Sequence, residues 1–159
     1  MNRTAIYIFL FSLCLGACTF STTRLNDKKD QDQTRQVAES FYKALKTKTY
    51  AKTYPFLADT FLKVTDTSKL NRFYKTYEDR MGTIDAVEFL KCETKAVNSN
   101  NSTLTAVIFY TVKRSLQTSY ERLLLQSVNG EPLKIVRYDI AEKPMVASQG
   151  QAKKITPLN

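Results

Sequence analysis

Apolar and polar residues alternate with two different periods, which divide the middle of the chain into a helical first third and a strand-rich remainder. Over residues 37–48 the apolar side chains recur at the i, i+4, i+7 spacing of an amphipathic helix. A second short helix is indicated over 50–57, with a break at Pro55. A third helix is predicted to begin at a Thr67 or Ser68 cap and to end at Gly82, a typical stop residue.

After Gly82 the apolar period changes from 3.6 to 2, which predicts strands. The predicted strands span residues 85–97, 103–114, 119–128 and 132–141. Asn129-Gly130 between the last two is a strong hairpin signal, because a type I′ turn needs positive φ at both positions. Helices followed by consecutive strands indicate an α+β fold with three N-terminal helices packed on a curved four-stranded antiparallel sheet.

Two biased segments flank this predicted domain of residues 34–141. Residues 18–33 are polar and charged, which favours a flexible tether. Residues 142–159 contain two prolines, a glycine and few apolar side chains, which favours a disordered tail. We therefore expect one folded domain with a mobile segment at each end.

The first 17 residues have the layout of a secretory signal. Arg3 gives a positive start, residues 6–15 form an apolar stretch, and small residues precede Cys18. A plain secretory signal and an uncleaved membrane anchor are the alternatives. The apolar stretch is shorter than the roughly 20 residues that a membrane-spanning helix needs.

The run Leu15-Gly16-Ala17-Cys18 resembles the lipobox of bacterial lipoproteins. The resemblance implies cleavage between Ala17 and Cys18, acylation of Cys18 with chains such as palmitate, and attachment to the cell envelope without a membrane span. Two or more acyl chains hold a protein on a bilayer stably. Thr19 after the cysteine, as in outer-membrane lipoproteins, implies a site on the outer membrane facing the periplasm.

Composition limits the partners and the chemistry of the mature chain of 142 residues. The formal net charge of +9 falls to +8 once Arg3 is removed. A basic envelope protein could sit near anionic lipid or surface polysaccharide, and a solvated basic surface is the simpler interpretation. No dense basic run with interleaved aromatics is present, so nucleic acid is not an expected partner.

The chain contains no histidine, which removes the most common general base and metal ligand. Serine or cysteine catalysis through a histidine is therefore excluded. Of the three cysteines, Cys14 leaves with the signal and Cys18 is the lipidation candidate. Cys92 remains alone and is expected to be a buried small apolar residue. We expect no cofactor and no metal.

The order of elements resembles the nuclear transport factor two-like fold, also called SnoaL-like or ketosteroid-isomerase-like. The segments that carry the resemblance are residues 37–42 (VAESFY), 50–54 (YAKTY) and 80–84 (RMGTI). The resemblance covers residues 34–141 and is one of topology. It implies a cone-like, cystatin/SnoaL-like arrangement in which the sheet wraps around the helices. Because this fold hosts enzymes, carriers and partner subunits, it does not define a function.

The Asn129-Gly130 turn predicts a register for the last two strands. If Val128 pairs with Glu131, Arg122 faces Arg137, and Asp139 lies on the same side of the sheet. Two adjacent arginines repel unless an anion lies between them. Arg122, Arg137 and Asp139 are thus ligand-binding candidates for an anion, with an exposed Arg-Asp ladder as the alternative. The opposite face is predicted to be the core and carries Leu123, Leu125, Val136, Tyr138 and Ile140.

Catalytic members of the resembled fold place an Asp, or a His-Asp pair, and a Tyr inside the cone. Without histidine, this chain could imitate only the Asp-Tyr version, with Asp59, Asp85 or Asp139 and with Tyr110. A buried carboxylate can act as an acid or base because burial raises its pKa. The spacing of these residues does not single out one of them.

Three functions remain open at this point. The leading hypothesis is a lipid-anchored, non-enzymatic envelope domain that binds a protein partner or an envelope component. The alternative is a carrier or sensor of a small apolar or anionic ligand held in the cone. The third is a histidine-free, isomerase-like enzyme. A filled cone with an exposed apolar patch would favour the first, and an empty cone the second.

Overall fold

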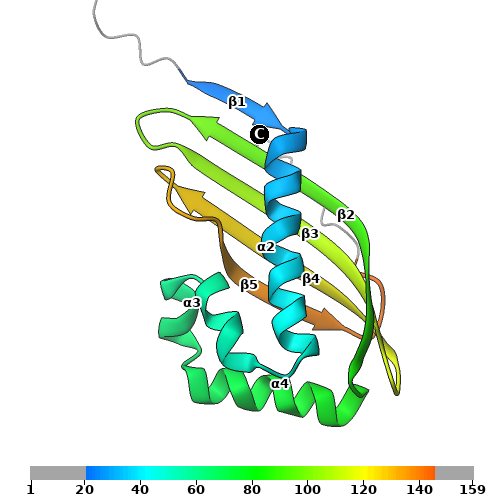
Figure 1. The fold of residues 1–159 in the computed structure, drawn as a ribbon. Helices are drawn as coiled ribbons and strands as arrows, with labels where there is room; N and C mark the ends of the chain where they lie inside the picture. Colours follow the sequence, from blue (N-terminus) through cyan, green and yellow to red (C-terminus); the bar gives the residue numbers. More distant parts are fainter. Residues whose placement is uncertain (1–20, 146–159) are drawn as a thin grey trace, which may run out of the picture.

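A computed structural model describes residues 21–145 and has an α+β fold, with helices on one side of an antiparallel sheet (Figure 1). The sheet has five strands in the order β1-β2-β3-β4-β5, so each strand pairs with its neighbours in sequence. The elements are β1 (Thr22–Leu25), α2 (Lys28–Lys46), the 3-10 helix η2 (Tyr50–Phe56), α3 (Asp59–Val64), α4 (Thr67–Met81), β2 (Ile84–Asn98), β3 (Thr103–Arg114), β4 (Thr118–Val128) and β5 (Lys134–Ala141).

The core lies between α2 and the face of the sheet that α2 crosses (Figure 1). Ala38 and Phe41 of α2 are fully buried against inward side chains such as Ile108 of β3 and Leu123 of β4. Leu70 and Tyr74 of α4 close the same core from the helical end. The core cluster runs from Ala38 to Ile135, so the described residues contain a core of their own.

The predicted tether over residues 18–33 is wrong for its described part, because this segment is ordered. Thr22–Leu25 form β1, which pairs with β2, and α2 already begins at Lys28. The Asp27 side chain caps α2 by accepting from the N–H of Lys29 at 3.0 Å. The buried Asp30 accepts from Arg24 at 3.0 Å, which ties β1 to the helix. Local capping and pairing therefore order a segment that lacks apolar periodicity.

The helical third contains one element more than predicted. The predicted second helix is a 3-10 helix with Pro55 inside it, and α3 follows it as a separate short helix. α4 ends at Gly82 as predicted, while its cap is Asp66, whose side chain accepts from the N–H of Lys69 at 2.8 Å. At the other end of the chain, Glu142 from the predicted tail pairs with Arg80, and residues beyond 145 lie outside the described part.

The turn between β4 and β5 forms as predicted. Asn129 and Gly130 have φ values of 52° and 79°, and the N–H of Glu131 donates to the Val128 carbonyl at 3.0 Å. Both central residues have positive φ, as a type I′ turn requires.

The predicted register beyond this turn is wrong by up to two residues. Pairing resumes only at Gln126 with Lys134, because the intervening Pro132 has no N–H to donate to the ladder. A bulge then leaves Val136 unpaired, so that Arg122 lies opposite Asp139 and not opposite Arg137. The bulge also removes Val136 from the core, and Ile135 is fully buried instead.

We predict that Gly82→Ala destabilises the domain more than Gly130→Ala. Both glycines have positive φ, which costs an alanine about 1–2 kcal/mol. At Gly82 an added Cβ would also lie 2.1 Å from Ser115 Oγ and 2.8 Å from the Leu116 backbone N, whereas nothing lies within 4 Å at Gly130. We expect the free energy of unfolding to fall by about 2–4 kcal/mol in Gly82→Ala and by about 1 kcal/mol in Gly130→Ala. Urea denaturation of residues 18–159 would test this, and equal losses would contradict the close approach.

Candidate functional site

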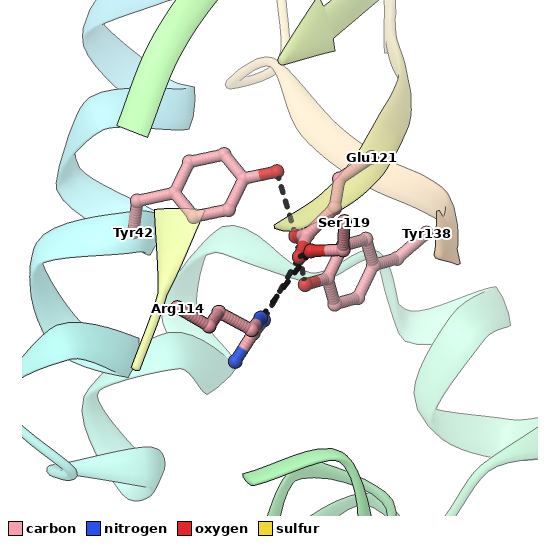
Figure 2. A network of polar contacts seen from close by, with 5 residues as sticks. All are labelled: Tyr42, Arg114, Ser119, Glu121 and Tyr138. Carbon is pink, nitrogen blue, oxygen red and sulfur yellow. Dashed lines mark hydrogen bonds and ion pairs between the residues drawn. The ribbon is translucent and has the colours of Figure 1, made fainter. Parts of the chain in front are cut away.

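The most unusual group in the interior is a buried carboxylate, Glu121, on β4. Its Oε1 accepts from Arg114 Nη2 at 2.8 Å and from Ser119 Oγ at 2.7 Å. Its Oε2 accepts from the hydroxyls of Tyr42 at 3.1 Å and Tyr138 at 2.5 Å. Figure 2 shows these side chains converging from α2, β3, β4 and β5. We call these five residues the Glu121 network.

Each member of the Glu121 network is placed by its own element. Ser119 and Glu121 are two residues apart on β4, so both point to the inner face together with Leu123. Arg114 ends β3, and its side chain is 6% exposed, whereas that of Glu121 is fully buried. Tyr42 comes down from α2 onto the sheet. The network therefore connects one helix with three strands.

Burial and the Glu121 carboxylate together determine the protonation of the side chains around it. Burial, reinforced by the Glu121 carboxylate, raises the pKa of Tyr42 and Tyr138 well above their usual value. Burial alone would lower the pKa of Arg114. The negative charge of Glu121 and its hydrogen bond with Arg114 outweigh this effect, so the pKa of Arg114 is raised. The tyrosines therefore stay protonated donors and Arg114 stays a cation.

The Glu121 network leaves little chemistry for an outside molecule. A carboxylate has about four acceptor positions, and Glu121 has four donors. The cavity next to Arg114 and Tyr138 measures about 20 Å³, which suits a single water molecule. For Glu121 to act as a base, a substrate would have to displace one of its internal donors. The arrangement instead holds elements together.

The predicted anion candidates lie together on the other face of the sheet. Asp139 accepts from Arg122 Nη2 at 2.8 Å and from Arg137 Nε at 2.8 Å. The carboxylate that the two arginines need is thus supplied by the chain itself. This contact is the Arg-Asp ladder given as the alternative, and such partly exposed pairs contribute about 0–1 kcal/mol.

The other predicted residues are dispersed. Asp59 and Asp85 are exposed on α3 and β2, so neither forms the buried Asp-Tyr pair considered for catalysis. Tyr110 is in the core on β3, where its hydroxyl is buried without a hydrogen-bond partner among the described residues. Cys92 is buried as predicted, and burial raises the pKa of its thiol to about 11. Ala17 and Cys18, the predicted cleavage and lipidation residues, lie outside the described residues.

Two hollows of about 430 Å³ each open at the surface, besides one of about 360 Å³ between the end of α4 and the end of β5. The first, which we call the β5 hollow, has a volume of about 430 Å³ and lies between α3, α4 and β5. Its lining is mainly apolar, with Arg137 and Asp139 as its charged members. Val64 is among its lining residues and is 79% exposed. The full lining is Thr60, Phe61, Val64, Thr65, Leu70, Phe73, Val136, Arg137, Tyr138 and Asp139.

The second hollow, which we call the α2 groove, also has a volume of about 430 Å³ and lies between α2 and strands β2 and β3. Its lining combines basic side chains of α2 with aromatic and aliphatic side chains of α2, β2 and β3. That lining comprises Arg35, Glu39, Tyr42, Lys43, Lys46, Val87, Phe89 and Tyr110. The two hollows share no residue.

Of the predicted ligand-binding candidates, the structure places Arg137, Asp139 and Tyr110 in the linings of these hollows and Arg122 in neither, and Glu121 is not among the predicted residues. A signal for Glu121 is present in the alternation of β4, since Glu121 shares its parity with the core residues Leu123 and Leu125. A charge on the inward side of a predicted strand indicates a buried network. Its partners on α2 and β5 become visible only in three dimensions.

No protein-family model matches the chain, and a comparison with curated proteins finds no match either. Within residues 21–145, no helix is long and apolar enough to cross a membrane. The same residues contain no group of three His, Cys, Asp or Glu side chains that could hold a metal ion.

We predict that Glu121→Gln lowers the free energy of unfolding by about 3–5 kcal/mol, because it leaves the charge of Arg114 buried without compensation. The matched control is Glu93→Gln, the same substitution at a carboxylate that is 47% exposed, with an expected change within about 0.5 kcal/mol. The double variant Glu121→Leu, Arg114→Met should recover part of the loss, because it removes both charges. Denaturant melts give all three values. A Glu121→Gln loss no larger than that of Glu93→Gln would contradict the buried pair.

Proposed function

We propose that this chain is a lipid-anchored, non-enzymatic binding domain of the bacterial cell envelope, and that it captures a protein partner at the β5 hollow. The observation that carries the proposal is the contrast between interior and surface. The space around Glu121 is filled by its own partners, whereas an apolar hollow of about 430 Å³ opens at the edge of the sheet. We further propose a relation to the nuclear transport factor two-like fold, with the cone-shaped interior filled.

The lipid anchor rests on the Leu15-Gly16-Ala17-Cys18 run, and we place it on the outer membrane facing the periplasm. Three residues separate Cys18 from β1, which begins at Thr22. At about 3.5 Å per residue, the anchor would hold β1 within roughly 15 Å of its acyl chains. The domain would thus sit close to the bilayer, with one fixed edge.

The chemistry of the β5 hollow suits an apolar side chain of another protein. Phe61, Leu70 and Phe73 give it apolar walls, and Val64 stands exposed among its lining residues. Exposed apolar patches on a monomer mark interaction sites. Arg137 and Asp139, also in the lining, offer both charges for orienting the polar backbone or side chains of a partner.

The backbone of β5 supports an extended partner segment. β5 is an edge strand, and part of its outer edge already carries a parallel bridge between Leu57 and Ile135. The N–H of Ala58 donates to the Ile135 carbonyl at 2.9 Å in this bridge. Strand addition to a free sheet edge is a common mode of peptide recognition. A partner strand could continue where this bridge stops, with a side chain in the hollow.

We predict that Cys18→Ser abolishes acylation, because the thiol is the acceptor in the proposed lipobox. Metabolic labelling with a radioactive or clickable fatty acid measures this directly. Cys92→Ser is the matched control and should keep its label, since Cys92 is buried in the domain. Equal labelling of the wild type and Cys18→Ser would contradict the lipid anchor without bearing on the hollow.

We predict that a photo-crosslinking residue at position 64 captures a discrete envelope protein in cells, because Val64 lies in the β5 hollow. The matched control is position 116, where Leu116 is also exposed, at 70%, but is not among the lining residues of the hollow. Adding Val136→Asp, which puts a charge at the unpaired bulge residue of the hollow, should reduce the capture at position 64 at least fivefold, a loss of about 1 kcal/mol.

Three outcomes would contradict the proposed partner site. They are equal capture at positions 64 and 116, capture that Val136→Asp does not change, and capture of a second copy of this chain alone.

A further inference from the structure

We propose that the α2 groove binds a single-chain amphiphile with an anionic head, of the fatty-acid carboxylate class. The groove shares no residue with the β5 hollow. Binding at the groove therefore goes beyond the proposed partner site, and an experiment can contradict one proposal without affecting the other. Its volume of about 430 Å³ falls within the roughly 300–1,000 Å³ of small-molecule sites.

The apolar part of the groove is built from Val87 and Phe89 of β2 together with the rings of Tyr42 and Tyr110. The Phe89 ring packs edge-on to the Tyr110 ring at 6.1 Å between centroids and still remains 41% exposed. A small inorganic anion would leave this ring uncovered. An acyl chain would cover it and gain from removing apolar area from water.

The charged rim of the groove is basic and incompletely neutralised. Arg35, Lys43 and Lys46 follow the groove side of α2, with Glu39 as the single acid among the lining residues. Arg35 Nη2 and Glu39 Oε1 are 3.9 Å apart, which is close to the longest distance for an ion pair. The Lys43 ammonium forms no ion pair or hydrogen bond within residues 21–145, where the only side-chain hydrogen bond to this residue reaches its backbone carbonyl. A carboxylate head would supply the missing negative charge.

The Arg35 guanidinium marks a place for that head. It lies over the Phe89 ring at 4.5 Å from the centroid, so a charged group and an apolar surface meet at one point. Such a junction matches an amphiphile, whose head and chain are covalently joined. Arg35 can also bind a carboxylate through two parallel hydrogen bonds.

The Tyr110 hydroxyl is the independent sign of a ligand. Tyr110 is 3% exposed and lines the groove, yet its hydroxyl has no hydrogen-bond partner among the described residues. Burial raises the pKa of this hydroxyl most, and the charges of Glu39 and Arg35, both lining residues, also act on it. Buried hydroxyls are usually paired, so an orphan hydroxyl at a groove indicates a missing acceptor. Because the hydroxyl oxygen is itself buried, a carboxylate oxygen would have to enter beside the exposed Arg35 and Glu39 side chains to become that acceptor.

The test uses residues 18–159 with Cys18→Ser, which keep the complete core described above, and decanoate below its micellar concentration. Isothermal titration calorimetry should show saturable binding of decanoate. Arg35→Gln should weaken this binding about tenfold, while the matched control Lys75→Gln on α4, which removes the same charge away from the groove, should leave it within twofold. Decanol, with the same chain and no charge, should bind at least tenfold more weakly.

Tyr110→Phe separates a ligand contact from a structural role. Removing an unpaired buried hydroxyl should leave the stability of the free domain unchanged or increased, and should weaken decanoate binding about threefold or more. The proposal is overturned if decanol binds as well as decanoate, or if Lys75→Gln costs as much as Arg35→Gln. It is equally overturned if Tyr110→Phe leaves the affinity unchanged, or if acetate binds as tightly as decanoate.

Discussion

A buried carboxylate constrains the arrangement of this fold. Glu121 has no exposed area, and an ion in that position is tolerated only when charge and hydrogen bonds replace the water it has lost. Arg114, Ser119 and two tyrosines do so from four different elements. A shift of α2 or of any of these strands would leave a charge or a hydroxyl unpaired. The network therefore disfavours other ways of packing the same helix on the same sheet.

The same constraint determines where recognition can occur. Around the network the inner face is packed with aromatic rings: Phe41 contacts Tyr138 at 5.3 Å between centroids, and Tyr42 contacts Tyr110 at 5.0 Å. The space between α2 and the sheet is thus filled by the protein's own side chains. The β5 hollow and the α2 groove lie at the margins of this packed interior, one next to the edge strand β5 and one along the flank of α2. Binding at the margins leaves the buried ion pair undisturbed.

The sequence predicted what depends on local pattern and failed where distant residues decide. β3 has the predicted bounds, and the turn at Asn129-Gly130 has the predicted geometry, because alternation and positive φ are local properties. β1 has four exposed residues and exists only because β2 offers it an edge. The β4–β5 register depends on a bulge at Val136 that no periodicity shows. Glu121 is compatible with burial only through partners that come from other elements.

The topology places the proposed anchor and the proposed partner site at opposite edges of one sheet. A continuous row of paired residues runs from Leu25 of β1 through Lys95, Thr105 and Gln126 to Lys134 of β5. Four steps between strands of about 4.8 Å make this row roughly 19 Å long. Lys134 is two residues before Val136 of the β5 hollow. If Cys18 holds β1 to the bilayer, the sheet itself is the spacer that presents the hollow at the far edge. Such a rigid spacer limits the orientations in which a partner can approach, which a flexible tether would not do.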